Sequence, residues 1–301
     1  MYKFKNLFCA VFVGMIAVSC NTNETEFGDD ESIESVKNYA PVNVHVLDFT
    51  TYVGDIPATR ANQAAADYAD VKTMQLAFYD ASTNALVYSD TQLRGDASTY
   101  TTFGEFSCSL PMGSYKMVVV GHGSTSAITL NSPTSAEFTA DKARETFAYT
   151  ETINITTTSP VDISAALNRI CSKLMLSSTD ALPASVKKIN VSFSGGGKAF
   201  NPTTGLATVN TGLTNNVTIG STVGSHCEVN SYIFLASEEQ TVDVTIDVYG
   251  AEDALLFHKI VSGVPLKRNR QTTLEGKIFS ASLGGGFTLS TDWLSGNIVT
   301  F

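Results

Sequence analysis

Short stretches in which every second residue is apolar recur along the chain, and this two-residue period is typical of β-strands with one buried face. In the first half, the alternating residues are Val42, Val44 and Val46, then Met74, Leu76 and Phe78, then Phe106, Cys108 and Leu110, then Ile153 and Ile155. Residues 80–84 predict a turn into a hairpin partner at 86–88. The nearly continuous apolar run at 114–120 predicts a central strand that is covered on both faces.

The second half repeats the pattern. Alternation occurs at Ile189, Val191 and Phe193, at Tyr232 and Phe234, and most clearly at Val242, Val244, Ile246 and Val248. Residues 255–261 are expected to pair with this last strand across a turn at 250–253, and residues 272–279 and 287–289 predict further strands. Close spacing of strands without amphipathic helices favours antiparallel sandwiches. The sequence therefore predicts an all-β protein with two antiparallel β-sandwich domains, at residues 41–160 and 161–301.

One segment fits two patterns. Leu167, Ile170, Cys171 and Leu174 have helical spacing, whereas Ile170, Ser172, Leu174 and Leu176 fit a strand. The segment follows a stretch rich in Thr, Ser and Pro at 156–160, which suits the start of the second domain. We predict a strand.

Composition and charge narrow the class of protein. Of the 301 residues, 43% are hydrophobic and 16% are charged, which is enough apolar material to build hydrophobic cores. The 19 Lys and Arg residues against 29 Asp and Glu give a net charge of −10. Because nucleic-acid binding needs a basic surface, this balance argues against a nucleic-acid partner.

The first residues resemble an export signal. Lys3 and Lys5 precede an apolar stretch at 7–18 that is too short to span a bilayer. The tetrapeptide Ala17-Val18-Ser19-Cys20 resembles a bacterial lipobox, so we expect a lipoprotein signal peptide at residues 1–19 and lipid attachment at Cys20. The alternative is an ordinary cleaved signal with an incidental cysteine. Residues 20–40, rich in acids, predict a flexible tether.

No motif for catalysis or metal binding emerges from the sequence. The four histidines His45, His122, His226 and His258 are isolated, so they lack the spacing of a metal site. Gly195-Gly196-Gly197-Lys198 lacks the first glycine and the following Ser or Thr of a phosphate-binding loop. We expect no cofactor, no metal and no enzymatic activity. Cys108, Cys171 and Cys227 are open to two interpretations, one disulfide or three free thiols.

Four loose motifs, in order along the chain, resemble the fimbrillin superfamily, the pilin, tip and anchor subunits of type V fimbriae of the Bacteroidales. They are Cys20 with its acidic tether, the strand at 42–53 followed by Thr59-Arg60-Ala61, the stretch Asn168-Arg169-Ile170-Cys171-Ser172-Lys173-Leu174, and residues 264–276 followed by Asp292-Trp293 and an apolar tail. The resemblance implies two transthyretin-like β-sandwich domains and a structural or adhesive subunit that assembles by donating a β-strand to a neighbour.

The resemblance also assigns roles to individual residues. Arg60 is the candidate site for cleavage by an arginine-specific protease, with Arg94 as a weaker rival and an uncut surface arginine as the alternative. Val42, Val44 and Val46 would belong to the strand that cleavage releases. Ile298, Val299 and Phe301 would form the donor tail, unless that segment completes the subunit's own sheet. The expected partners are other fimbrial subunits and, through the lipid, the outer membrane at the cell surface.

The motifs leave the role within a fimbrium open between stalk, tip and anchor. A second function class also stays open, that of a surface glycan-binding lipoprotein, because β-sandwiches host many functions. An exposed row of Tyr79, Tyr88 and Tyr100 would favour this alternative, since sugars stack on exposed aromatic rings.

Overall fold

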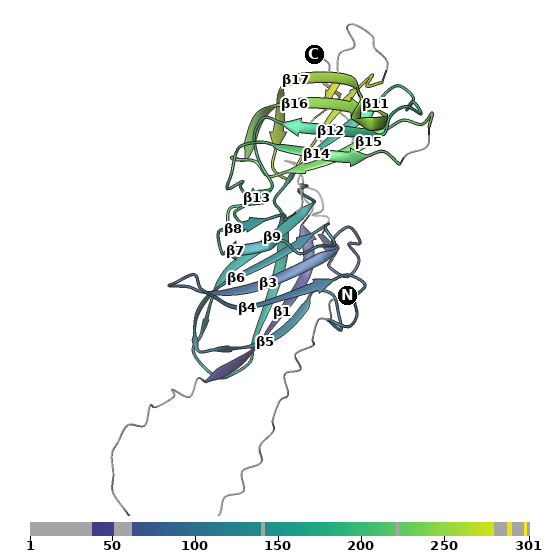
Figure 1. The fold of residues 1–301 in the computed structure, drawn as a ribbon. Helices are drawn as coiled ribbons and strands as arrows, with labels where there is room; N and C mark the ends of the chain where they lie inside the picture. The colour runs from purple at the N-terminus through teal and green to yellow at the C-terminus, as the bar shows by residue number, and fades with distance from the viewer. Residues whose placement is uncertain are drawn as a thin grey trace, which may run out of the picture. The chain divides into compact units, whose positions relative to one another are not determined.

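The alternating stretches form strands. The computed structural model describes residues 38–50, 62–139, 142–220, 223–279, 288–290 and 298–299. These residues are all β apart from one short 3-10 helix, η1 (Ala251–Asp253), which confirms the predicted fold class (Figure 1). Within them, no helix is long and apolar enough to cross a membrane.

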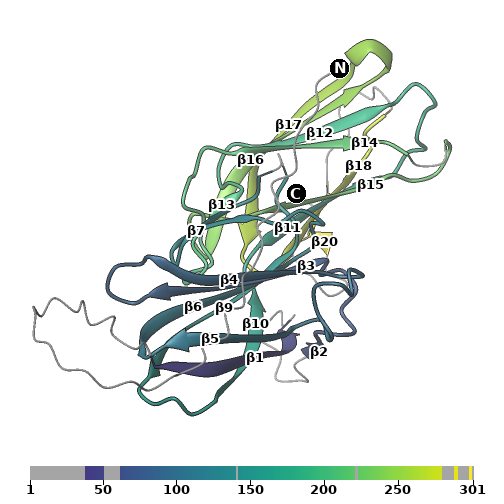
Figure 2. The same cartoon turned by 60° about the horizontal axis from the view of Figure 1, so that its bottom comes forward.

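The largest sheet has eight strands in the order β2-β1-β10-β9-β6-β3-β4, with β5 paired to β1. Its members are β1 (Tyr39–Thr50), β2 (Asn62–Ala64), β3 (Thr73–Asp80), β4 (Leu86–Leu93), β5 (Glu105–Pro111), β6 (Gly113–His122), β9 (Thr146–Ile155) and β10 (Val161–Arg169). Strands β9 and β10 pair only at Ala148 with Asn168 and at Phe147 with Arg169. At this corner the sheet folds over itself, so that β3, β4, β6 and β9 face β1, β5 and β10 (Figure 2).

The first hydrophobic core fills the space between these two layers. It takes alternate residues from β1, β3, β6 and β10, because successive side chains of a strand point to opposite faces. Met117 and Val119 of β6 belong to this core, whereas Val118 and Val120 face away from it into another buried cluster. Strand β6 is therefore covered on both faces, as the apolar run at 114–120 predicts.

The turn between β3 and β4 is built by Asp80. Its carboxylate accepts hydrogen bonds from the backbone N–H groups of Ser82 and Thr83, at 3.0 and 2.8 Å. Asn84 has a φ of 58°, a conformation that asparagine tolerates better than most residues. The hydrogen bonds from Ser82 and Thr83 lower the pKa of Asp80 to about 2. The predicted turn at 80–84 and hairpin partner are thus confirmed.

Two further sheets enclose the second core. One has the order β15-β11-β18-β19-β20 and the other β14-β12-β16-β17. Their strands are β11 (Ser172–Ser178), β12 (Lys188–Phe193), β14 (Leu213–Thr218), β15 (Glu228–Ile233), β16 (Glu239–Tyr249), β17 (Leu255–Lys267), β18 (Gln271–Gly276), β19 (Thr288–Ser290) and β20 (Ile298–Val299). The ambiguous segment contains no helix, but it is divided between two strands: Leu167 lies in β10, residues 170–171 separate the strands, and Leu174 and Leu176 lie in β11. β16 pairs with β17 across the expected turn.

A small third sheet, in the order β13-β8-β7, covers the outer face of β3 and β6. It consists of β7 (Thr129–Ser132), β8 (Ser135–Glu137) and β13 (Ala199–Phe200). Phe138, Phe200 and Phe234 meet beside it, and the rings of Phe200 and Phe234 stack with their centroids 4.3 Å apart. This cluster joins residues from both halves of the chain, and residues Lys37–Phe301 form one compact unit.

The structure differs from the sequence prediction in three local respects. β1 begins at Tyr39, and Ala40 is fully buried, so these two residues belong to a strand and not to the predicted tether. β10, expected to open the second domain, lies in the first sheet beside β1. The pairs β1–β10 and β11–β18 are parallel, which alternation alone does not reveal because it is the same in both directions. The domain boundary at 160/161 stays a prediction.

Candidate functional site

The predicted removable strand lies in the middle of the first core. Val42 and Val44 of β1 are fully buried and Val46 is 4% exposed. One edge of β1 pairs in parallel with β10 from Val42 to Thr50. The other edge pairs antiparallel with β5, from Tyr39 to His45, and with β2 further along. β1 is thus enclosed on both edges and contributes alternate side chains to the core.

The predicted donor tail is described only in part. Ile298 and Val299 form β20, whose backbone pairs with β19 at the end of the five-stranded sheet. Within the described residues this ladder has two residue pairs, Leu289 with Val299 and Ser290 with Ile298. Phe301, the lipidation candidate Cys20 and the cleavage candidate Arg60 lie outside the described residues.

Arg94, the rival cleavage site, is tied into the fold. Its guanidinium donates hydrogen bonds to the backbone carbonyls of residues 65, 66, 68 and 71, at 2.7 to 3.2 Å. It also lies 4.0 Å from the centroid of the Phe103 ring. A protease could reach Arg94 only after these contacts are broken.

The row of exposed tyrosines that would favour glycan stacking is not found. Tyr79 is 1% exposed, and its hydroxyl donates to the Leu130 carbonyl at 3.0 Å. Tyr88 packs against the first core beside Phe78, and Tyr100 packs against Phe103. Neighbouring positions on a strand face opposite ways, so Tyr79 lies on the far side of the sheet from Phe78 and Tyr88.

Three cysteines and one histidine are structural. Cys108, Cys171 and Cys227 are free thiols, and burial raises the pKa of Cys108 to about 11 and that of Cys171 to about 12. His122 is fully buried, lies 3.2 Å from the Gln75 side-chain oxygen and packs edge-on against Phe138. Burial lowers the pKa of His122 to about 4. These groups therefore serve packing.

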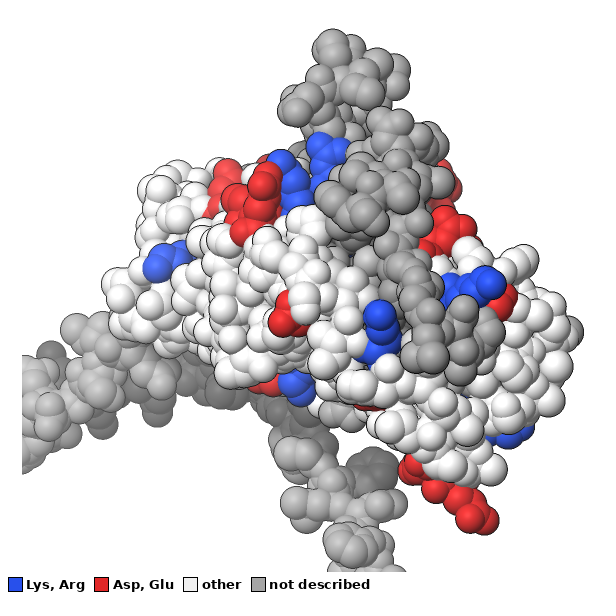
Figure 3. Space-filling view, turned by 90° about the horizontal axis from the view of Figure 1, so that it is seen from above, with Lys and Arg blue, Asp and Glu red and all other residues white. Residues whose placement is uncertain are grey.

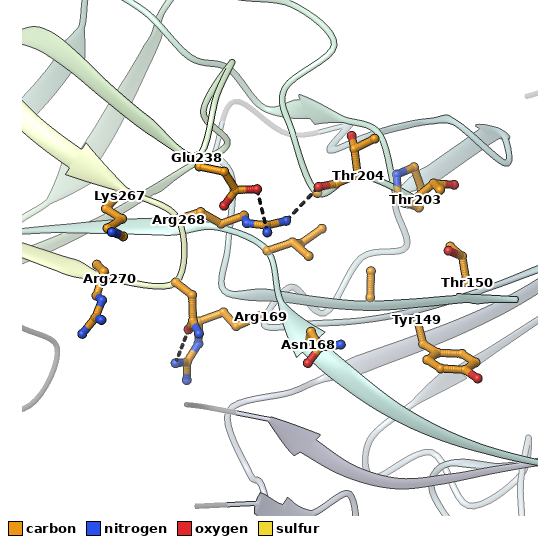
Figure 4. A pocket seen from close by; sticks show the side chains of 15 residues that line it. Tyr149, Thr150, Asn168, Arg169, Thr203, Thr204, Glu238, Lys267, Arg268 and Arg270 are labelled. Carbon is orange, nitrogen blue, oxygen red and sulfur yellow. Dashed lines mark hydrogen bonds and ion pairs between the residues drawn. The ribbon is translucent and has the colours of Figure 1, made fainter. Parts of the chain in front are cut away.

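A polar pocket of about 550 Å³ lies where the end of β10 meets two turns, residues 202–205 and 267–270 (Figure 4). Further lining residues come from β9 and from Glu238. The cations at its wall are Arg169, Lys267, Arg268 and Arg270, and Glu238 is the one acid among the lining residues that the structure describes. In a chain with net charge −10, this local excess of positive charge stands out.

One wall of the pocket is formed by Arg268. Its guanidinium forms an ion pair with Glu238 at 2.7 Å and donates to the Thr204 carbonyl at 2.7 Å (Figure 4). Gly205 allows this approach, since it has a φ of +72° and a Cβ there would lie 2.7 Å from an Arg268 nitrogen. The Asn201 side chain accepts from the Thr203 backbone N–H at 2.9 Å and thereby shapes the same turn.

The opposite wall is backed by a buried ion pair. Arg169 lies 2.7 Å from Glu145, with side-chain exposures of 3% and 9%. Its guanidinium also donates to Asn269 and to the Tyr68 hydroxyl, both at 3.2 Å. Burial, and next the negative charge of Glu145, raise the pKa of Tyr68. The network links β10 to the turn at 267–270.

The turn at 267–270 is held by its backbone. The N–H of Asn269 donates to the Cys171 carbonyl at 2.9 Å, and the N–H of Lys173 donates to the Arg270 carbonyl at 3.0 Å. Asn269 adopts a φ of 56°. On the face in Figure 3, most of the described surface is neither acidic nor basic. The three basic residues of this turn are visible in the sequence, but their pocket partners are far away along the chain.

The comparisons with known proteins give one family and several distant structural similarities. The chain is similar to a Bacteroides ovatus protein described as a candidate adhesin, with 12% identity and a TM-score of 0.49, over 90% of this chain and 98% of that one. It is also similar to the fimbrial anchor protein Mfa2 of Porphyromonas gingivalis, with 12% identity and a TM-score of 0.49, over 84% and 97%.

No curated protein matches the chain. A family model described as a family of unknown function, DUF6562, matches residues 41–298, which include both cores and the pocket. The chain belongs to this family, DUF6562.

Proposed function

We propose that this chain is an exported surface lipoprotein that serves as a structural or adhesive fimbrial subunit, assembled by β-strand donation after cleavage at Arg60. The observation that carries the proposal is β1. It is a twelve-residue strand with alternating buried residues, paired along both edges, and it directly precedes the segment that contains Arg60.

Release of β1 would leave a groove in which binding of a replacement strand is strongly favourable. The groove would expose unpaired backbone groups of β5 and β10 and the cavities that Val42, Val44 and Phe49 now fill. Burial of each such side chain contributes about 1.5–3 kcal/mol, so an empty groove is unstable. A strand from a neighbour with apolar residues at alternate positions would restore both the ladder and the core.

The C-terminal tail fits the role of such a strand. Among the described residues, β20 pairs with β19 through two residue pairs, so detachment of this described part costs few hydrogen bonds. In an extended donor strand, Val299 and Phe301 would face one side and Ile298 the other. The contacts of Arg94 with four carbonyls count against the rival cleavage site, because proteases prefer chain segments that are easily unfolded.

The test is to treat the purified full chain with an arginine-specific protease. We expect one early cut after Arg60, identified by mass spectrometry from a new N-terminus at Ala61, followed by polymers seen by size exclusion and electron microscopy. Arg60→Lys keeps the charge but removes the cleavage site, so it should stay uncut and monomeric. Arg144→Lys is the matched control and should behave as the unaltered chain.

Two outcomes would contradict the proposal. One is resistance at Arg60 with a stable monomer, and the other is clean cleavage at Arg60 without polymers at any concentration tested.

A further inference from the structure

Two polar residues of β1 lie on its outer face, away from the first core. Val42, Val44 and Val46 belong to the core, so the residues between them, Asn43 and His45, face the opposite side. On this side β1 lies between β5 and β10 (Figure 2). Both polar side chains are only partly buried, and they contact side chains of the neighbouring strands instead of the core.

Asn43 and His45 each reach both neighbouring strands. The Asn43 amide donates to Asp162 of β10 at 2.8 Å and accepts from the Ser107 hydroxyl of β5 at 2.9 Å. The His45 ring pairs through Nδ1 with the Glu105 carboxylate of β5, and its Nε2 lies 3.9 Å from Asp162. The two residues thus join three strands through side chains, in addition to the backbone ladders.

The core face of β1 is less distinctive than this outer face. Its first half presents valines at alternate positions, and similar runs of branched apolar residues occur at 189–193 and 242–248. A strand of this kind would fill the same core positions, since hydrophobic burial is not directional. Phe49 is a distinctive core residue, but it lies beyond the ladder irregularity between Val46 and Asp48. Along the first half, the outer face therefore distinguishes β1 from other apolar strands.

We propose that Asn43 and His45 determine which strand occupies the site between β5 and β10, by favouring β1 over a competing strand. A competitor matches β1 only if it carries hydrogen-bonding side chains at two alternate outward positions, beside Glu105 and Asp162. Because both positions face acids, an amide, an imidazole or a cation suits them best. The contacts lie at a partly exposed surface, so each one contributes modestly and the row acts through their sum.

The C-terminal tail meets this requirement only in part. In an extended tail with Val299 and Phe301 towards the core, the outward residues are Ile298 and Thr300, which supply one hydroxyl and no amide, imidazole or cation. The intact β1 is therefore favoured over the tail of a neighbour until cleavage separates β1 from the rest of the chain. This last step rests on the proposed function, whereas retention of β1 in the uncleaved chain does not.

The first test is hydrogen exchange of the full, uncleaved chain, measured by mass spectrometry of peptides from each strand. The double substitution Asn43→Ala with His45→Ala removes the four contacts. It should speed exchange in β5 and β10 about tenfold, because β1 leaves its site more often. Exchange in β16, which lies in the second core, should stay unchanged.

Leu47→Ala is the matched control, since it truncates an exposed side chain of the same strand. It should leave exchange in β5 and β10 as in the unaltered chain. Two substitutions in β5 serve if the double variant does not fold. Ser107→Ala removes the hydroxyl that bonds Asn43, and Glu105→Gln removes the charge beside His45. Each should speed exchange in the same two strands by a smaller factor.

The second test measures replacement of β1 directly. Biotinylated peptides are mixed with the uncleaved double variant, and the captured fraction is measured. One peptide has the native sequence of residues 38–50, and another carries alanine at positions 43 and 45. The native peptide should be captured about tenfold more, because it restores the contacts with β5 and β10. A third peptide, residues 291–301, represents the tail and should be captured less than the native peptide.

Four results would overturn the proposal. They are equally faster exchange in every strand, equal exchange in the double variant and in Leu47→Ala, equal capture of the native and alanine peptides, and capture of the tail peptide as strong as that of the native peptide. Failure of the tail peptide to bind at all, with the native peptide captured, supports the selection of β1 and counts against the proposed role of the tail. The two proposals therefore fail separately.

Discussion

At the scale of single residues, the least exposed charges in the structure are those of Arg169 and Glu145. They form an ion pair, and Tyr68 and Asn269 accept further hydrogen bonds from the guanidinium. A charge removed from water needs such partners, and loss of one member leaves the other uncompensated. The pair therefore fastens the end of β10 to the turn at 267–270 and shapes the wall of the pocket.

Glu145→Ala should lower the free energy of unfolding by roughly 3–5 kcal/mol, because it leaves the Arg169 charge buried without a counter-ion. Chemical denaturation measures this change. Glu239→Ala is the matched control, since it removes one carboxylate from an exposed ion pair with Lys267, and it should change stability little. Equal effects of the two substitutions would show that the buried pair is not special.

A second prediction concerns His122, whose pKa of about 4 lies below the ordinary value of 6.5 because of burial. Between these pH values the unfolded chain binds a proton there and the folded chain does not. Stability from this residue is therefore present above pH 6.5 and is lost as the pH falls towards 4, by roughly 3 kcal/mol.

Denaturation at a series of pH values checks this slope. His122→Gln should flatten it between pH 6.5 and 4, whatever its effect on stability at neutral pH. The unaltered chain, measured over the same pH range, gives the reference slope. An unchanged slope in His122→Gln would refute the assignment.

At the scale of elements, β1 and β20 differ greatly in how they are held. β1 pairs along both edges and contributes alternate side chains to the first core, whereas the described part of β20 adds two residue pairs at the end of a sheet. β5 finds its ladder partner in β1 among the described strands, so loss of β1 would also leave β5 without a ladder partner there. Replacement of β1 by a strand from a neighbour would thus affect two strands, β1 and β5, whereas displacement of β20 would affect one.

Deletion of residues 295–301 should therefore leave a folded monomer but abolish polymers after cleavage at Arg60. Circular dichroism and thermal unfolding report the fold, and electron microscopy reports the polymers. Replacement of the same seven residues by a Gly/Ser sequence of equal length provides the control for chain length, and it should also fail to polymerise. Equal polymerisation by the full-length and shortened chains would refute the role of the tail.

At the scale of the whole molecule, the features that follow from the two-residue alternation of apolar side chains were predicted from the sequence. The alternation of Val242, Val244, Ile246 and Val248 matches their burial in β16. The all-β class and the hairpins follow from the same rule. The local period did not predict strand direction, because alternation is the same in parallel and antiparallel pairs. β1 and β10 pair in parallel although they are far apart in the chain.

The pocket could not be predicted from the sequence, for a related reason. Its wall combines residues near 149, 168, 203, 238 and 268, and only the fold brings these segments together. The sequence displayed the basic turn at 267–270, yet nothing local indicates which of its charges meets a carboxylate. Similarly, Tyr79 and Tyr88 were open to interpretation as one exposed row, because the partners that bury them come from other strands.

The pairing of β1 with β10 also has a consequence for the order of events during synthesis. Asn43 of β1 and its neighbour Asp162 of β10 are 119 residues apart, and Ser107 of β5 is 64 residues from Asn43. At a ribosomal rate of roughly 5–20 residues per second, β5 is synthesised about 3–13 s after β1, and β10 about 6–24 s after β1. Throughout this interval the valines of β1 lack the strands that pair with it in the folded protein, so they are exposed to non-native contacts.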